Sequence, residues 1–334
     1  VGCELEKTDS ELENGKCPIH PKQDIELIDE ENYFFAFSKF KQPLLDLYEK
    51  NPKLVIPDFR FNEIKAFVGR GLEDFSISRL ATKMPWGVPV PNDSEHVMYV
   101  WFDALVNYIF NKEKWHNAVQ YCGKDNLRQQ SAMWQAMLMA AGIKNTDKIL
   151  INGFLNGADG KKMSKSLGNV INSYDAVKEI GTDAVRFYLT YNVSSFEDSP
   201  ISMDMMKESF NANLANGIGN LTNRIVKMAE NYDVVVKLPE EGAVWIDKEF
   251  VGQAYHEAFK NFEPQKALEY LMNEVREMDL FIATEQPFKK VKVDELSAKE
   301  DVARLMLNLL YMGVLLEPFM PETSAKVVEA VGTR

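Results

Sequence analysis

Hydrophobic positions follow different spacings on the two sides of residue 202. Before it, three short apolar runs, at residues 97–102, 118–122 and 148–155, are predicted as strands. A strongly periodic helical stretch, residues 126–141, separates the second run from the third, and Gly142 follows it as a helix stop. Strands that alternate with helices are typical of a parallel sheet. This part of the chain is therefore predicted to be α/β.

Beyond residue 202 the strand signals fade and long helical patterns replace them. Four such stretches follow one another: residues 203–230, 247–262, 263–284 and 298–316. They predict an all-helical bundle. Residues 1–25, by contrast, are polar and rich in turn-forming residues, and residues 30–80 have helical spacing.

Composition narrows the class of protein. The chain has 334 residues, 46% hydrophobic and 26% charged, which fits a globular protein of two or three domains. No apolar run reaches the about 18 residues of a membrane-spanning helix, no secretory leader opens the chain, and three cysteines are too few for a disulfide framework. We therefore expect a cytoplasmic protein that does not contact membranes. A net charge of −12 argues against non-specific nucleic-acid binding. It does not exclude a specific RNA that binds to local basic patches.

A cationic segment follows the third predicted strand. Lys162, Ser164, Lys165 and Ser166 lie between Gly160 and Gly168, which favour mobility. Lysines that approach phosphates only in the transition state stabilise growing negative charge without over-binding the nucleotide. Considered alone, a Lys/Ser loop is typical of a solvated turn. The whole string, placed after a strand, favours an ATP-binding loop.

This string, Lys-Met-Ser-Lys-Ser, is identical to a signature of class I aminoacyl-tRNA synthetases. Four further segments resemble methionyl-tRNA synthetases and occur in that family's order: residues 80–91, 99–108, 123–125 and 214–221. The resemblance covers nearly the whole chain. It implies the second half of a Rossmann-like parallel-sheet catalytic domain with a zinc-knuckle insertion, followed by an all-α anticodon-binding bundle.

The resemblance also assigns expected roles to four regions. They are a connective insertion with a partial zinc knuckle and following helices (1–80), the second half of the catalytic domain (81–160), the Lys-Met-Ser-Lys-Ser loop with a stem-contact region (161–201), and a truncated anticodon-binding domain (202–334). The implied activity is that of a methionine–tRNA ligase, which activates methionine with ATP and Mg²⁺ and transfers it to tRNA(Met). Lys162 and Lys165 would be its catalytic residues.

A methionine pocket should offer aromatic faces and apolar walls, because sulfur–aromatic contacts are favourable. Trp101, Ala104, Leu105 and Tyr108 share one face if their segment is helical. Spacing alone favours an aromatic core stripe. The resemblance instead implies that Trp101, Leu105 and Tyr108 line the methionine side chain. Where many family members have a histidine, this chain has Gln130, which forms hydrogen bonds but does not titrate.

Gly123 and Asp125 end the second predicted strand, where a parallel sheet binds ligands. The resemblance places both at the ATP site. Asp125 would hold either the ribose hydroxyls or the ammonium group of the amino acid, and the sequence leaves both alternatives open.

Cys3, Cys17 and His20 have part of the spacing of a zinc site, with one Cys-x₂-His pair and one unpaired cysteine. Free thiols and a surface histidine explain these residues equally well. The resemblance implies a structural Zn²⁺ site that lacks one ligand. Cys122, on a predicted strand, is expected to be a buried apolar side chain.

In the predicted bundle, Asn220 and Arg224 are four residues apart and share a helix face. Spacing alone favours a solvated polar pair. The resemblance implies that both contact the tRNA anticodon, and that Phe288 stacks on an anticodon base where the family usually has tryptophan. Core packing is the alternative for Phe288.

The family's second signature, His-x-Gly-His, is not formed by any of the four histidines. We therefore expect a fragment that needs the N-terminal half of its nucleotide fold as a partner and does not form methionyl-adenylate alone. Two other functions stay open: a class I synthetase of the Leu, Ile, Val or Cys type, and a non-catalytic tRNA-binding module.

Overall fold

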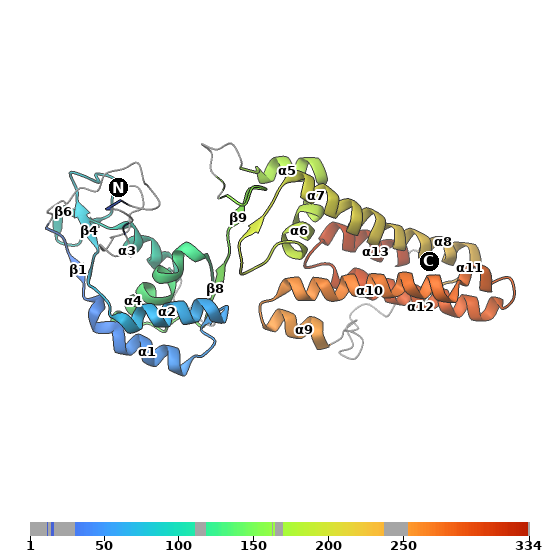
Figure 1. Cartoon of the computed structure of the whole chain (residues 1–334), viewed down its shortest axis with the longest axis horizontal. Helices are drawn as coiled ribbons and strands as arrows, with labels where there is room; N and C mark the ends of the chain where they lie inside the picture. Colours follow the sequence, from blue (N-terminus) through green and yellow to red (C-terminus); the bar gives the residue numbers. More distant parts are fainter. Residues whose placement is uncertain are drawn as a thin grey trace. The chain divides into compact units, whose positions relative to one another are not determined.

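A computed structural model describes Leu12, Gly15, Lys16, Met163 and residues 31–110, 118–161, 170–236 and 253–332 (Figure 1). The chain forms two compact units. The first consists of Val1–Gln120 and Asn126–Leu150, and the second of Tyr121–Asp125 and Ile151–Arg334. Among the described helices, none combines the length and apolar character needed to cross a membrane.

A small sheet has the strand order β2–β8–β7, formed by β2 (Val55–Ile56), β8 (Lys148–Asn152) and β7 (Val119–Gly123). β2 and β8 are parallel, as the alternation of strands and helices predicts, with Val55 opposite Ile149. Both of these side chains are buried. The sequence thus places the second and third predicted strands correctly, and β8 ends earlier than expected.

Helices α1 (Lys41–Lys50), α2 (Asp58–Arg70) and α4 (Trp134–Ala140) belong to the first unit. Tyr48 on α1 donates a hydrogen bond to the Ser131 carbonyl at 2.7 Å, just before α4. The predicted helix at 126–141 is not uniform. It begins as a 3₁₀ turn (Lys124–Asn126) and widens into a π-helical turn (Gln129–Met133) before α4. Such π-turns are often found at functional sites.

The prediction of a strand over residues 97–102 is wrong in extent and in pairing. β6 (Asp93–Met98) ends at Met98, and helix α3 (Val100–Ala104) begins two residues later. β6 also lies in an antiparallel sheet, between β4 (Ser78–Leu80) and β5 (Pro89–Val90). The apolar run is continuous because a strand end is followed by a helix whose Trp101 and Phe102 pack on a hydrophobic cluster.

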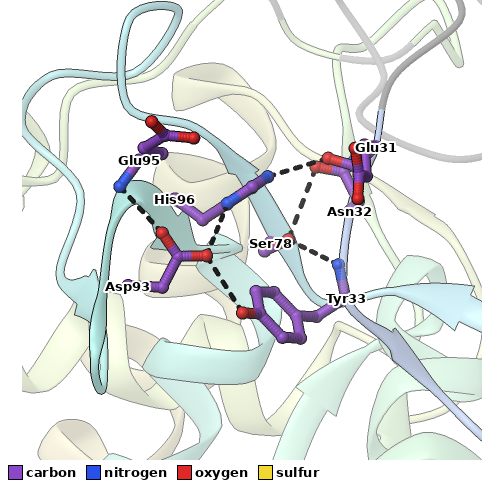
Figure 2. Close-up of polar contacts among 7 residues, drawn as sticks. All are labelled: Glu31, Asn32, Tyr33, Ser78, Asp93, Glu95 and His96. Atoms are coloured by element: carbon purple, nitrogen blue, oxygen red, sulfur yellow. Dashed lines mark hydrogen bonds and ion pairs between the residues drawn. The ribbon is translucent and has the colours of Figure 1, made fainter.

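A second antiparallel pair, β1 (Phe34–Phe35) with β3 (Phe75–Ser76), belongs to the same unit. A polar cluster ties the segment before β1 to β6 (Figure 2). His96 on β6 contacts the Asp93 carboxylate through Nδ1 and the Glu31 carbonyl through Nε2, both at 2.8 Å. Tyr33 donates its hydroxyl to Asp93 at 3.0 Å. Because a carbonyl and a carboxylate only accept, both nitrogens of His96 carry a proton, and the imidazolium joins the two segments.

The pKa directions agree with that charge state. The hydrogen bonds to the Glu31 carbonyl and to Asp93 raise the pKa of His96. The pKa of Asp93 is lowered, first by the backbone N–H of Glu95 and then by His96. His96 therefore holds its proton more firmly than an ordinary histidine, and Asp93 stays ionised to lower pH.

In the second unit, the third predicted strand is interrupted at Gly153. A side chain there would place its Cβ 2.2 Å from the backbone of Glu197, so only glycine fits. The chain continues as β9 (Leu155–Asn156), which pairs in parallel with β10 (Ser199–Pro200). Helices α5 (Ser173–Ile180) and α6 (Thr182–Tyr191) lie between them in sequence, and the Asn172 side chain caps α5.

The rest of the second unit is helical, as predicted (Figure 1). Its helices are α7 (Met203–Ser209), a π-helical stretch (Phe210–Gly219), α8 (Asn220–Tyr232), α9 (Gln253–Lys260), α10 (Pro264–Glu285), α11 (Pro287–Lys290), α12 (Glu295–Leu315) and α13 (Pro321–Gly332). Their core is built almost entirely of leucine, isoleucine, valine, methionine and alanine side chains. This composition explains why helical periodicity locates the bundle so well.

Candidate functional site

The candidate pocket residues of the first unit lie on three short helical segments. Trp101 is on α3, Leu105 and Tyr108 are on the 3₁₀ helix Leu105–Ile109, and Gln130 is in the π-helical turn. The structure brings two of them into direct contact, since Gln130 Nε2 donates to Tyr108 Oη at 3.1 Å. Leu105 is buried in a cluster on which Trp101 packs.

The expected common face of this segment is altered by a change of helix type. The chain passes from α-helix to 3₁₀ helix at Leu105, so the turn tightens. Ala104 is exposed while Leu105 is buried. Tyr108 contacts the Trp134 ring, with centroids 6.0 Å apart, and remains 38% exposed. Its phenol therefore has one side on the core and one side accessible to a ligand.

Behind Tyr108 lies a buried series of hydrogen bonds. Gln120 Nε2 donates to Gln130 Oε1 at 3.0 Å, and Thr146 Oγ1 donates to Gln120 Oε1 at 2.8 Å. Gln135 Nε2 donates to Thr146 Oγ1 at 3.0 Å, while the Thr146 backbone N–H donates to Gln135 Oε1 at 3.1 Å. Apart from Tyr108, every side chain in the series is buried. These contacts fix the position and orientation of Gln130.

Sequence reasoning did not find Gln120, Gln135 or Thr146. A signal was present, because Gln120 interrupts an apolar strand and Gln135 lies in an apolar helix, where the periodicity predicts buried positions. A polar side chain at a buried position has a hydrogen-bond partner as a rule. Its presence therefore indicates a network, although the sequence does not reveal the partners.

Gly123 and Asp125 lie at the end of β7 in the second unit. A Cβ on Gly123 would approach Asp125 Oδ1 to 2.8 Å, so glycine leaves room for that carboxylate. Between them, Lys124 pairs with Asp198 at 2.7 Å and lies 4.7 Å from the centre of the Phe154 ring. The pKa of Asp198 is lowered, chiefly by Lys124. Asp125 itself is exposed, and its carboxylate can reach a ligand at this strand end.

Cys122, one residue earlier, is partly buried and forms no disulfide. Burial, together with the negative charge of Asp125, raises the pKa of its thiol to about 12. The thiol is therefore protonated near neutral pH and a poor nucleophile.

Several candidate residues lie outside the described residues. These are Lys162, Ser164, Lys165 and Ser166 of the cationic loop and the proposed zinc ligands Cys3, Cys17 and His20. Gly160 precedes the loop with φ +74°, in a turn where its N–H donates to the Gly157 carbonyl. Within the described ranges, no group of three His, Cys, Asp or Glu side chains could hold a metal ion.

The candidate RNA-binding residues are all described. Asn220 and Arg224 lie on α8, and Arg224 Nη1 contacts Asp279 Oδ1 of α10 at 2.6 Å. Phe288 on α11 is 44% exposed, with the Lys289 ammonium 5.9 Å from its ring centre. Phe288 is therefore not fully buried in the core, and its ring is accessible for stacking.

Comparison with known proteins gives a consistent result. The family model described as tRNA synthetases class I (M) matches residues 2–226. The methionine–tRNA ligase of Thermosynechococcus vestitus is 36% identical over 99% of this chain and 66% of its own length. That of Rickettsia typhi is 37% identical over 92% of this chain and 64% of its own length. The chain thus spans about two thirds of the curated relatives it matches.

A similar structure is that of Mycobacterium tuberculosis methionyl-tRNA synthetase in complex with methionyl-adenylate. It aligns with a TM-score of 0.84 and 30% identity, covering 98% of this chain and 68% of that one. The free-state structure of the same protein aligns with a TM-score of 0.75 over 90% of this chain.

Proposed function

Because the chain belongs to the class I (M) family of tRNA synthetases, we propose that it provides most of a methionine–tRNA ligase. Methionine's carboxylate attacks the α-phosphate of ATP and displaces pyrophosphate, which gives methionyl-adenylate. A terminal ribose hydroxyl of tRNA(Met) then attacks the activated carbonyl and displaces AMP. The likeness to a solved synthetase that holds methionyl-adenylate is the observation that supports this proposal best.

The methionine side chain is assigned to the first unit. Trp101 and Tyr108 supply aromatic faces, and Leu105 supplies an apolar wall, which suits a flexible and polarizable thioether. Tyr108 fits this role because its ring rests on the core while its hydroxyl is accessible. Gln130 acts through its hydrogen bond to that hydroxyl.

The nucleotide is assigned to the loop lysines and to the end of β7. Lys162 and Lys165 stabilise the charge that grows on pyrophosphate, with Ser164 and Ser166 as additional hydrogen-bond donors. At the end of β7, Gly123 gives the room that the Asp125 carboxylate requires. Alanine in place of either lysine should lower kcat by about 100-fold with a smaller effect on KM, as expected for contacts made in the transition state.

Two roles remain for Asp125, and one variant separates them. Asp125→Asn keeps the shape but removes the charge. If Asp125 pairs with the ammonium group of methionine, the variant raises KM for methionine far more than KM for ATP. If it holds the ribose hydroxyls, the larger change is in KM for ATP.

Two metals enter the proposal. Mg²⁺ bound to ATP supplies charge neutralisation at the phosphates. Structural Zn²⁺ prefers cysteine sulfur and histidine nitrogen ligands, which are supplied here by Cys3, Cys17 and His20. Elemental analysis of the purified protein should find zinc, and Cys17→Ser should lower the zinc content. Unchanged content in that variant would contradict the assignment.

The anticodon is assigned to the bundle. Arg224 stacks on a base or pairs with phosphate, Asn220 reads a base edge and Phe288 stacks. Gel-shift titration with tRNA(Met) tests this, with Phe288→Ala weakening binding and Phe288→Trp preserving it. Leu296→Ala, at another exposed apolar position, is the control.

The overall activity is tested by amino-acid-dependent ATP–pyrophosphate exchange on this chain supplied with the N-terminal half of the nucleotide fold, since the chain alone is expected to give no exchange. Methionine should support exchange and leucine, isoleucine, valine and cysteine should not. Exchange with one of those four would favour another class I specificity. Binding of tRNA without any exchange would favour a non-catalytic tRNA-binding module.

A further inference from the structure

The buried series behind Tyr108 has a direction, and one backbone group sets it. A backbone N–H can only donate, so the Thr146 N–H identifies the side-chain atom of Gln135 that it contacts as the oxygen. The other terminal atom of Gln135 is then the nitrogen, which donates to Thr146 Oγ1. The amide of Gln135 is therefore oriented by the main chain, without reference to any ligand.

The direction passes from Gln135 through Thr146 to Gln120. Thr146 Oγ1 accepts from Gln135 and has one hydrogen of its own, which it donates to Gln120 Oε1 at 2.8 Å. In the reverse orientation, Gln120 would donate to Thr146, and the buried threonine hydroxyl would lose this acceptor. A buried donor without an acceptor is costly, so the observed orientation is favoured.

The last two contacts follow from the same argument. With its oxygen held by Thr146, Gln120 presents its Nε2 to Gln130 Oε1, and Gln130 in turn presents its Nε2 to Tyr108 Oη. The Tyr108 hydroxyl is thereby used as an acceptor. Because Gln130 donates to this oxygen, the hydroxyl's own proton is directed away from the Gln130 amide, and Tyr108 is exposed on one side.

We propose that Gln120, Gln135 and Thr146 are positioning residues that, through Gln130, make Tyr108 a hydrogen-bond donor to the substrate side chain. The inference rests on the proposed function, in which that side chain is methionine's thioether. Thioether sulfur is a weak acceptor and never a donor. A tyrosine hydroxyl whose proton was directed at Gln130 would present only lone pairs to the sulfur, and the contact would not be favourable.

The series also makes this donor insensitive to pH. Its members behind Tyr108 are amides and one hydroxyl, none of which titrates near neutral pH. The orientation of the Tyr108 proton therefore depends on geometry alone. A variant that introduces one titratable group into the series should make ligand selectivity depend on pH, which a change in packing alone would not do.

Gln120→Glu is that variant. The ionised carboxylate still accepts from Thr146 but cannot donate to Gln130, so the Gln130 amide turns over and accepts the Tyr108 proton. The protonated carboxyl group can donate, which restores the original direction. Burial raises the pKa of a carboxyl group, so the change of direction should occur within an accessible pH range.

The readout is the ratio of affinities for methionine and norleucine, in which a methylene group replaces sulfur and no acceptor is present. Calorimetric titration of the whole protein between about pH 6 and pH 8.5 should give a constant ratio for the wild type. In Gln120→Glu the ratio should fall by about two- to tenfold as pH rises, which is the effect of one ordinary hydrogen bond.

Three controls separate the possible outcomes. Gln253→Glu makes the same chemical change at an exposed position and should leave the ratio constant. Tyr108→Phe removes the donor, and Gln120→Glu should have no further effect in that background. If Gln120→Glu does not fold, Thr146→Val removes the hydroxyl without adding charge and should lower the ratio at every pH.

A wild-type protein that binds neither ligand would contradict the proposed function itself. The positioning role alone would be overturned by a different result. In that result the wild type prefers methionine, and the ratio of methionine to norleucine affinity in Gln120→Glu is also high and does not change with pH. An equal loss in the presence and absence of the Tyr108 hydroxyl would show that the change acts through packing rather than through Tyr108.

Discussion

The bundle of the second unit and the interior of the first unit are stabilised by different kinds of contact. The bundle buries an almost wholly apolar core along α8, α10 and α12. The first unit buries apolar clusters too, but it also encloses three glutamines and a threonine that are joined by hydrogen bonds. Apolar contacts have no direction, whereas amide hydrogen bonds specify which atom faces which. The interior of the bundle is thus held by contacts without direction, whereas contacts in the first unit fix the orientation of the Gln130 side chain.

The largest expected effect comes from making a cavity in the bundle. Leu309 on α12 is fully buried, so Leu309→Ala should cost about 2–5 kcal/mol of unfolding free energy. Urea unfolding followed by circular dichroism measures the change. Leu296, on the same helix, is 72% exposed, and Leu296→Ala should change stability by less than about 0.5 kcal/mol. Similar losses in both variants would show that the core is not where the bundle's stability lies.

A smaller loss is expected when the amide series is broken. Gln135→Met keeps the length of the side chain but leaves the Thr146 N–H and the Gln130 carbonyl without this partner. An unsatisfied buried group costs about 1–3 kcal/mol. Gln42→Met, at an exposed position whose amide donates to the Asp46 carboxylate, is the matched control. If Gln135→Met leaves the free energy of unfolding unchanged, apolar packing rather than directed hydrogen bonding stabilises the first unit as well.

The same contrast explains how far the sequence predicts the fold. The predicted stretches 203–230, 263–284 and 298–316 agree with the structure to within a few residues at each end, because apolar positions repeat there at the helical period, whereas α11 and α13 were not among the predicted stretches. Residues 97–102 were misassigned because a strand end and a helix start are both apolar there. Periodicity over six residues cannot separate these two cases, and it says nothing of antiparallel pairing with β4 and β5.

The candidate site shows a similar division. Gln130 was identified from its place in a resembled motif, and the structure shows it in contact with Tyr108. Gln120 and Thr146 were not found, because they lie 10 and 16 residues away from it in sequence and meet it only in the folded chain. Asp279 escaped for the same reason, being on a different helix from Arg224. Contacts between distant segments depend on the packing of elements, which a single sequence does not reveal.

A third prediction concerns an electrostatic contact in the first unit. The pKa of His96 is raised in the folded state, so its contribution to stability is complete below about pH 6.5, the ordinary value, and is lost as pH rises through the folded-state pKa. Groups facing the ring are Asp93, the Glu31 carbonyl and Tyr33, with the Glu31 carboxylate nearby. The thermal unfolding midpoints (Tm) of His96→Gln and the wild type should differ most below about pH 6.5 and should converge as pH rises.

At low pH, the stabilisation that the His96–Asp93 contact gives is limited by protonation of Asp93. Its pKa is lowered, so its contribution is present above its ordinary value near 3.8 and is lost as pH falls through the folded-state pKa. Asp93→Asn should therefore reduce the pH dependence that His96 produces. A difference between His96→Gln and wild type that grows with rising pH would contradict an imidazolium in the folded protein.

The smallest effect is expected at the Arg224–Asp279 pair, which is electrostatic like the His96 cluster but lies on the bundle surface. The two side chains are 39% and 36% exposed, so their coupling in a double-mutant cycle should be about 0.2–1 kcal/mol and should fall as salt is added. Because this ion pair is weak, Arg224 can leave the Asp279 carboxylate and bind RNA instead. Asp279→Asn should then strengthen tRNA(Met) binding by no more than about fivefold, measured by gel shift at constant salt. Weaker binding in this variant would mean that Asp279 positions Arg224 for the RNA instead of competing with it, and the bundle surface would then control side-chain orientation as the first unit's interior does.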